Sequence, residues 1–155
     1  SGNLIKKATE LYERNRAYSL VESHIEDEDY IKSKEKLSSL SEYLNPDETK
    51  DLEAKIQSIY PDSLLTKSQT ESLERQKDLA LKAREVYIAM GMETFEADKK
   101  YVEALLNESK DQLNQKYQGR SENSIIENLE KIKNDSLFKE LINKNIQRPK
   151  VDALI

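Results

Sequence analysis

The stretch that decides the fold runs from Thr66 to Gln118 and reads TKSQTESLERQKDLALKAREVYIAMGMETFEADKKYVEALLNESKDQLNQKYQ. Its apolar residues recur at steps of three and four, the spacing of helices that bury one face. Thr66 or Ser68, followed three residues later by Gln69 or Glu71, has the spacing of a capping box and predicts the helix start. The apolar positions are Leu73, Leu79, Ala80, Ala83, Val86, Tyr87, Met90, Phe95, Ala97, Tyr101, Val102, Ala104, Leu105, Leu106, Leu113 and Tyr117.

One unbroken helix over residues 66–118 would be on the order of 80 Å long. A compact chain of this length has a radius of gyration of only about 15 Å, so such a rod could not bury its apolar face. We therefore predict a break at Met90-Gly91-Met92, with Gly91 in the left-handed conformation past a helix end and Thr94 capping the next helix. The alternative is that Gly91 sits inside one long helix, at a cost of about 1 kcal/mol against alanine.

Three helices are predicted before this stretch. Leu4, Leu11, Tyr18 and Ile25 lie at steps of seven and predict a first helix about 33 Å long. Asn15 and Glu22 interrupt the remaining apolar positions, so we do not expect a long coiled coil. A second helix is expected from residue 30 to residue 44. The run Asn45-Pro46-Asp47-Glu48 then caps a third, which ends before Pro61.

Two further helices are predicted after Gly119, which ends the central stretch. Ser121 or Ser124 starts the first of them, and Asn134-Asp135-Ser136 starts the second. We expect the last helix to include Ile146 and to close at Pro149. The apolar tail at residues 151–155 is expected to lie on the bundle or to be loose, with addition to a partner as the alternative.

These elements predict an all-α fold, an antiparallel bundle of about six or seven helices built from stacked hairpins. The chain of 155 residues is expected to form a single domain, 1–155. Possible sub-units are a three-helix part at 1–61, the helices of 62–148 and a tail at 149–155. Charged residues make up 35% of the chain and hydrophobic residues 36%, a balance typical of amphipathic helices.

Residues 28–46 carry a spaced pattern: a tyrosine near a turn, a small residue three positions later and a proline near the end. It resembles the second helix of a tetratricopeptide repeat, which would imply stacked helix hairpins and a concave peptide-binding face. Val21 and Leu40 are bulky where that motif has small residues, and a second echo lies 64 to 67 residues on, depending on the alignment, whereas the repeat has a period of 34. We therefore do not assign the family. The residues concerned are Ala17, Leu20, Val21, Tyr30, Ser33, Leu37, Asn45 and Pro46, with the echo at Ala97, Tyr101, Ala104 and Leu105.

We expect no catalytic, cofactor or metal site. His24 is the only histidine and there is no cysteine, which excludes disulfides and cysteine-ligated metals. A calcium loop begun at Asp27 would need glycine at its sixth position and glutamate at its twelfth, but Lys32 and Ser38 stand there. The eight tyrosines are expected at the margins of a thin core, with a tyrosine-lined partner groove as the alternative.

The net charge of −5 is spread along the chain, so we expect no nucleic-acid partner. No run of eighteen apolar residues occurs, so we expect no transmembrane segment. We expect a non-catalytic protein-interaction or scaffold module whose partner is another protein. Its lack of cysteine and its composition favour the soluble portion of a secreted or surface-anchored bacterial protein. The alternatives are an intracellular helical-repeat adaptor that binds a peptide or partner helix, and a metal-independent enzyme that uses polar groups in the bundle core.

Overall fold

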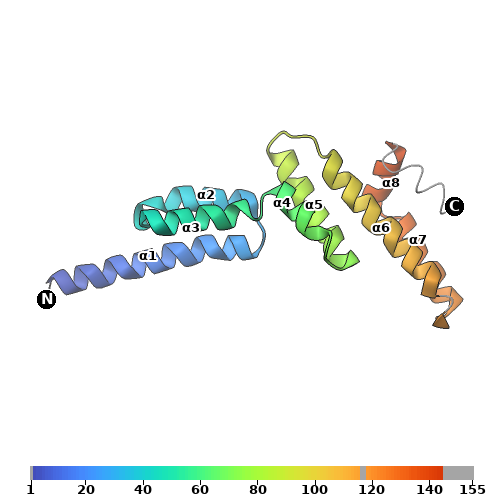
Figure 1. The fold of residues 1–155 in the computed structure, drawn as a ribbon, viewed down its shortest axis with the longest axis horizontal. Helices are drawn as coiled ribbons and strands as arrows, with labels where there is room; N and C mark the ends of the chain where they lie inside the picture. Colours follow the sequence, from blue (N-terminus) through green and yellow to red (C-terminus); the bar gives the residue numbers. More distant parts are fainter. Residues whose placement is uncertain (1, 116–117, 145–155) are drawn as a thin grey trace. The chain divides into compact units, whose positions relative to one another are not determined.

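Eight α-helices and one short 3-10 helix make up the part of the chain that the computed structural model describes, residues 2–115 and 118–144 (Figure 1). No β-strand occurs in these residues, so the all-α prediction is confirmed, with eight helices instead of six or seven. The chain divides into two compact units, Ser1–Leu64 and Leu65–Ile155, each described by itself below; the single-domain assignment stays a prediction. The elements are α1 (Gly2–Glu26), α2 (Tyr30–Leu40), η1 (Ser41–Tyr43), α3 (Pro46–Gln57), α4 (Pro61–Ser68), α5 (Leu73–Ala89), α6 (Phe95–Gln115), α7 (Glu122–Lys133) and α8 (Ser136–Asn143).

Helix α4 is not among the predicted helices, because Pro61 was expected only to end the preceding one. Proline also suits the first position of a new helix, where its missing N–H has no partner to lose. The Leu64 amide accordingly donates to the Tyr60 carbonyl at 3.0 Å and closes the first turn. Leu64 and Leu65 are buried, and this tertiary packing stabilises the two-turn helix.

The predicted helix start at Thr66 or Ser68 is wrong, because both residues belong to the last turn of α4. The buried Ser68 hydroxyl donates to the Leu65 carbonyl at 2.6 Å, a bond made within a helix and not at its start. The cap of α5 is Ser72, whose hydroxyl accepts the Arg75 amide at 3.3 Å. Several residues with capping side chains occur close together here, and the spacing rule alone did not select the right one.

The break at Gly91 is confirmed. Gly91 has a φ of 68°, and its amide donates to the Ile88 carbonyl at 3.0 Å, while the Met92 amide donates to the Tyr87 carbonyl at 2.8 Å. This pair of bonds is the Schellman arrangement that ends a helix at a left-handed glycine. Helix α6 then begins directly after Thr94, as predicted.

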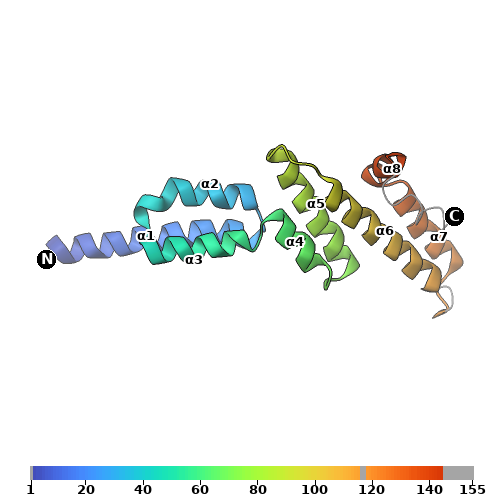
Figure 2. The same ribbon diagram turned by 45° about the horizontal axis from the view of Figure 1, so that its top comes forward.

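The first unit is built from α1, α2 and α3, which contact one another pairwise (Figure 2). Its buried side chains include Ala17, Val21 and Ile25 on α1 and Leu52 and Ile56 on α3. The predicted cap at Asn45 is confirmed as a full capping box, with the Asn45 side chain accepting the Glu48 amide at 2.8 Å. The second helix is shorter than predicted: α2 stops at Leu40, and η1 tightens the chain before the cap.

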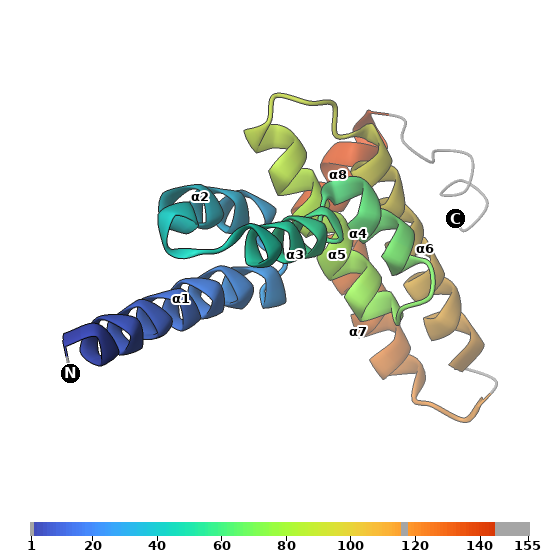
Figure 3. The ribbon, with the colours of Figure 1, turned by 60° about the vertical axis from the view of Figure 1, so that its left-hand side comes forward.

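Helix α6 packs against α5, α7 and α8, and it lies between α5 and the α7–α8 pair in Figures 1 and 2; Figure 3 shows the same helices from another side. The predicted recap at residues 134–136 is confirmed, since the Asp135 side chain accepts the Phe138 amide at 2.8 Å. Helix α7 begins after Ser121, the first of the two predicted starts. The predictions for Ile146, Pro149 and the tail fall outside the described residues. The core of this unit contains Leu65, Ala80, Ala83, Tyr87, Ala97, Tyr101, Val102, Leu105, Leu106, Ile132, Phe138, Leu141 and Ile142.

Candidate interaction surfaces

His24 is half-buried in the last turn of α1, and its side chain forms no hydrogen bond or ion pair with the described residues. Its backbone carbonyl accepts the Asp29 amide at 3.0 Å, which helps to turn the chain into α2. Among residues 2–115 and 118–144 no group of three or more metal-ligating side chains comes together. The surfaces that remain as candidate sites are therefore grooves and exposed apolar patches.

A polar network joins α1 to α3 in the first unit. The Tyr18 hydroxyl donates to Asp51, and Lys55 Nζ donates to the Tyr18 hydroxyl and to Glu22 Oε2, both at 2.8 Å. The hydrogen bond from Tyr18 lowers the pKa of the Asp51 carboxyl, and the bonds to Glu22 and Tyr18 raise the pKa of Lys55. Every charged group is paired, so the network is a helix-to-helix clamp and not a reactive site.

Arg14 lies where α1 meets the segment before α3, and Thr9, Glu10 and Glu13 line an open groove there together with Glu42–Asn45. Arg14 Nε lies 3.1 Å from Glu48 Oε1, the oxygen that also accepts the Asn45 amide in the α3 capping box. Residues 2–12, before this ion pair, are all exposed, and we call these roughly three turns the free turns of α1. Figures 1 and 2 show them running past the ends of α2 and α3.

The free turns carry four large apolar side chains in solvent. Leu4 is 71% exposed, Ile5 70%, Leu11 52% and Tyr12 64%. At 100° per residue, all four lie within about 60° of Ala8 around the helix, so they form one apolar face. Ala17, which is buried in the unit, is nine residues from Ala8 and therefore about 180° away. Val21 and Ile25, which are also buried, lie about 140° and 100° from Ala8 by the same measure, so the apolar face of the free turns is rotated by roughly 100° to 180° from the residues that α1 buries.

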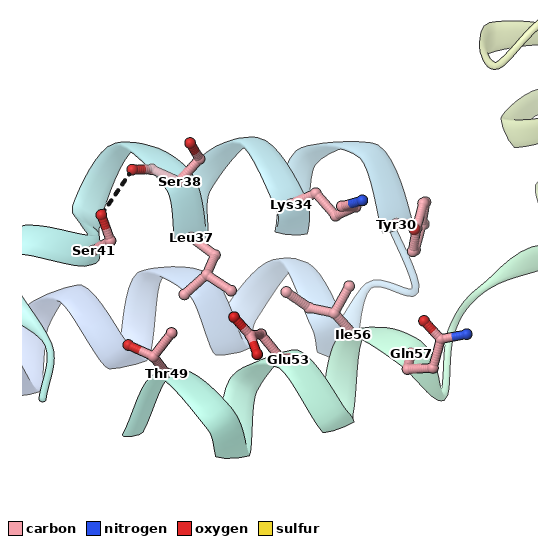
Figure 4. A pocket seen from close by; sticks show the side chains of 9 residues that line it. All are labelled: Tyr30, Lys34, Leu37, Ser38, Ser41, Thr49, Glu53, Ile56 and Gln57. Carbon is pink, nitrogen blue, oxygen red and sulfur yellow. Dashed lines mark hydrogen bonds between the residues drawn. The ribbon is translucent and has the colours of Figure 1, made fainter. Parts of the chain in front are cut away.

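An open groove of about 440 Å³ runs between α2 and α3 (Figure 4). Leu37 and Ile56 form its apolar floor, and Lys34 lies with its Nζ 5.4 Å from the centre of the Tyr30 ring. Tyr30 also meets Tyr60 edge to face at 5.2 Å between ring centres, which holds it in place. At the end of the groove away from Tyr30, the Ser41 hydroxyl donates a hydrogen bond to the Ser38 backbone carbonyl at 3.2 Å. The groove therefore combines an apolar floor with a polar rim.

A smaller groove of about 300 Å³, in the second unit, is lined by polar groups that already pair with one another. Lys77 Nζ lies 2.9 Å from Glu108 Oε2, and the Asn128 amide donates to Gln112 at 3.1 Å. At its edge the Tyr101 hydroxyl donates to Asp135 Oδ2 at 2.9 Å. Burial, and then the bond to Asp135, raise the pKa of Tyr101 and keep the phenol neutral. Because these groups satisfy one another, the groove offers few of them to a ligand.

The turn between α5 and α6 carries a second exposed apolar patch, which we call the α5–α6 tip. Four large apolar side chains within eight residues are 40% to 54% exposed: Ile88, Met90, Met92 and Phe95. Turns are usually polar, and methionine adapts its shape to different surfaces, so such a cluster is typical of a contact site. The backbone beneath it is fixed by the glycine bonds that end α5.

The tyrosines do not share one location. Tyr30, Tyr87 and Tyr101 are buried in core positions, whereas Tyr12 and Tyr43 are exposed. Tyr117 lies outside the described residues. Tyr30 is the one tyrosine among the residues that line the α2–α3 groove, and the tyrosine-lined partner groove stays a prediction.

No protein-family model matches this chain, and neither a curated protein nor a solved structure matches it closely enough to identify a relative. Among the described residues no helix combines the length and the apolar character that crossing a bilayer requires. The candidate surfaces are consequently judged on their own chemistry.

Proposed function

We propose that this chain is a non-catalytic protein-interaction module that docks a protein partner on the α5–α6 tip. The supporting observation is the exposure of Ile88, Met90, Met92 and Phe95 at the end of a helix pair whose backbone is firmly set. Exposed apolar groups gathered at one place favour association because a partner removes them from water. The proposed setting is the soluble portion of a secreted or surface-anchored bacterial protein.

The test compares three forms of the chain in quantitative affinity capture from the cells that produce it. The tip variant, Ile88→Ser with Phe95→Ser, is expected to lose a discrete partner at least tenfold against wild type. The matched control, Ile126→Ser, changes another exposed isoleucine of the same unit and should capture the partner as wild type does. Circular dichroism confirms that all three are folded. Equal capture by the tip variant and wild type would contradict docking at this surface.

A second candidate is an adaptor that holds a peptide or partner helix in the α2–α3 groove. It is favoured by the groove's apolar floor and by Lys34 and Glu53, which offer one charge of each sign to an extended ligand. Ser38→Arg places a long side chain at the rim, where Ser38 is already exposed. Loss of the captured partner by Ser38→Arg but not by the tip variant would favour the groove over the tip.

A further inference from the structure

The sulfur atoms of this chain all lie at the α5–α6 tip. The sequence has two methionines and no cysteine, and the two methionines, Met90 and Met92, stand on either side of Gly91. Their side chains are 40% and 43% exposed, and their α-carbons lie within about 7 Å of each other along the chain. Cysteine and methionine are the side chains that mild oxidants attack at sulfur, so such an attack on this chain is directed to one surface.

The backbone of the tip is held by hydrogen bonds that do not involve sulfur. Gly91 has a φ of 68° and donates its amide to the Ile88 carbonyl, while the Met92 amide donates to the Tyr87 carbonyl. Both methionine side chains are exposed, outside the buried core of the second unit. A chemical change at the two sulfur atoms should therefore alter the surface of the tip and leave the fold intact.

A peroxide converts a methionine thioether into a sulfoxide. A lone pair of the sulfur attacks one oxygen of hydrogen peroxide, and the S–O bond forms as the O–O bond breaks. The other oxygen takes the proton of the first and leaves as water, so the sulfur loses two electrons and the peroxide is reduced. A dithiol reductase reverses the change, because its two thiols become a disulfide and the sulfoxide oxygen leaves as water.

We propose that Met90 and Met92 form a reversible oxidation site through which peroxides switch docking at the α5–α6 tip. Oxidation replaces an adaptable apolar side chain with a polar one. A partner that covers Ile88 and Phe95 would then bury S–O groups beside apolar surface, and we expect its affinity to fall about tenfold. The control of docking rests on the proposed function, whereas the oxidation site does not.

Mass spectrometry of the full chain during treatment with hydrogen peroxide tests the oxidation site. Each methionine is expected to gain one oxygen at a rate within about threefold of that of methionine in a short unfolded peptide, because susceptibility follows exposure. Circular dichroism should stay unchanged, while retention on a hydrophobic-interaction column should fall. The double variant Met90→Leu with Met92→Leu keeps the apolar volume and should show no fall in retention. Oxidation more than about tenfold slower than in the peptide, or loss of helix on oxidation, overturns the proposal.

Quantitative affinity capture with the reduced and the oxidised chain tests the switch. Oxidised wild type is expected to lose the partner about tenfold, and to regain it after treatment with methionine sulfoxide reductases and dithiothreitol. The double leucine variant should keep the partner after the same peroxide treatment. A matched control adds Leu113→Met to that variant and so places a sulfoxide on α6, at a side chain that is 44% exposed; it should also keep the partner.

Equal capture by oxidised and reduced wild type overturns the switch, and so does loss of the partner by either peroxide-treated control. The proposed function fails in a different measurement, which uses only the reduced chain. If the reduced tip variant, Ile88→Ser with Phe95→Ser, captures the partner as reduced wild type does, then nothing docks at the tip, and the switch is overturned together with the proposed function.

Discussion

The free turns of α1 and helix α6 carry apolar residues at similar spacing, yet they differ completely in burial. Leu105 on α6 is 3% exposed, whereas Leu11 on α1 is 52% exposed. Helix α6 packs against three other helices of its unit, but the free turns extend past the helices that cover the rest of α1. The comparison teaches that an amphipathic pattern indicates a helix with an apolar face and says nothing of which molecule covers that face.

The largest expected effect comes from truncating a leucine at the centre of α6. Leu105→Ala leaves a cavity in the core of the second unit and should lower the free energy of unfolding by about 3 to 5 kcal/mol. Chemical denaturation measures the change. Leu113→Ala, an exposed leucine on the same helix, is the control and should change stability by less than about 0.5 kcal/mol. Similar losses for both variants would mean that α6 is not buried as described.

The next largest effect is expected at the buried carboxylate in the first turn of α6. Asp98 is 5% exposed, and it accepts from Arg84 Nε at 2.8 Å and from the Thr94 hydroxyl at 2.7 Å. Asp98→Ala leaves the arginine unpaired and should cost about 3 kcal/mol of unfolding free energy. Glu96→Ala removes an exposed acid from the same turn and so controls for the helix dipole. A double-mutant cycle with Arg84→Ala should show coupling, and its absence would contradict the ion pair.

A smaller effect, with a pH dependence, is expected at Tyr101. Tyr101→Phe removes the hydrogen bond to Asp135 and should cost about 2 kcal/mol near neutral pH. The pKa of Tyr101 is raised in the fold, while the unfolded chain ionises near 10, so the unfolded chain loses this proton first. The stability linked to this proton is therefore fully present below about pH 10 and falls as the pH rises further.

Urea unfolding between pH 9 and pH 12 tests this dependence. Wild type should lose stability faster than Tyr101→Phe above pH 10, by up to about 1.4 kcal/mol per pH unit. The comparison of the two forms cancels the other groups that titrate in the same range. Parallel curves for wild type and Tyr101→Phe would show that the phenol ionises equally easily in the folded and the unfolded chain.

The smallest effect is expected on the free turns. Leu11→Ala should change the unfolding free energy by less than about 0.5 kcal/mol in dilute solution, where the side chain is already in contact with water. Chemical denaturation at micromolar concentration measures the change. A loss of 2 kcal/mol or more in dilute solution would mean that Leu11 is packed within its own chain.

Local rules in the sequence were sufficient for most helix ends. Asn45 and Asp135 cap helices because their side chains accept amides that no helix carbonyl can reach, and Gly91 ends a helix because it adopts a positive φ without strain. The rules failed where several nearby residues could cap the same helix equally well. Ser72 caps α5, and Thr66 and Ser68 do not, because those two residues lie inside the additional helix α4, whose Leu64 and Leu65 are buried.

The candidate surfaces were less predictable. Leu4, Leu11, Tyr18 and Ile25 lie seven residues apart, which indicated one continuous apolar stripe along the helix. In the structure, the face that α1 packs against its unit differs from the apolar face of its first three turns. The exposed tip was not predicted either, because the sequence analysis placed Met90 and Phe95 on the apolar stripe and left Ile88 outside it.

The sequence by itself determined that this chain is helical, where most of its helices begin and end, and that cysteine chemistry is excluded, because these properties depend on residues close together along the chain. Only the tertiary structure decided which apolar faces are covered and which stay exposed, because burial depends on the neighbours that distant segments provide. Tertiary structure therefore decided the three candidate surfaces: the α2–α3 groove, the α5–α6 tip and the free turns of α1.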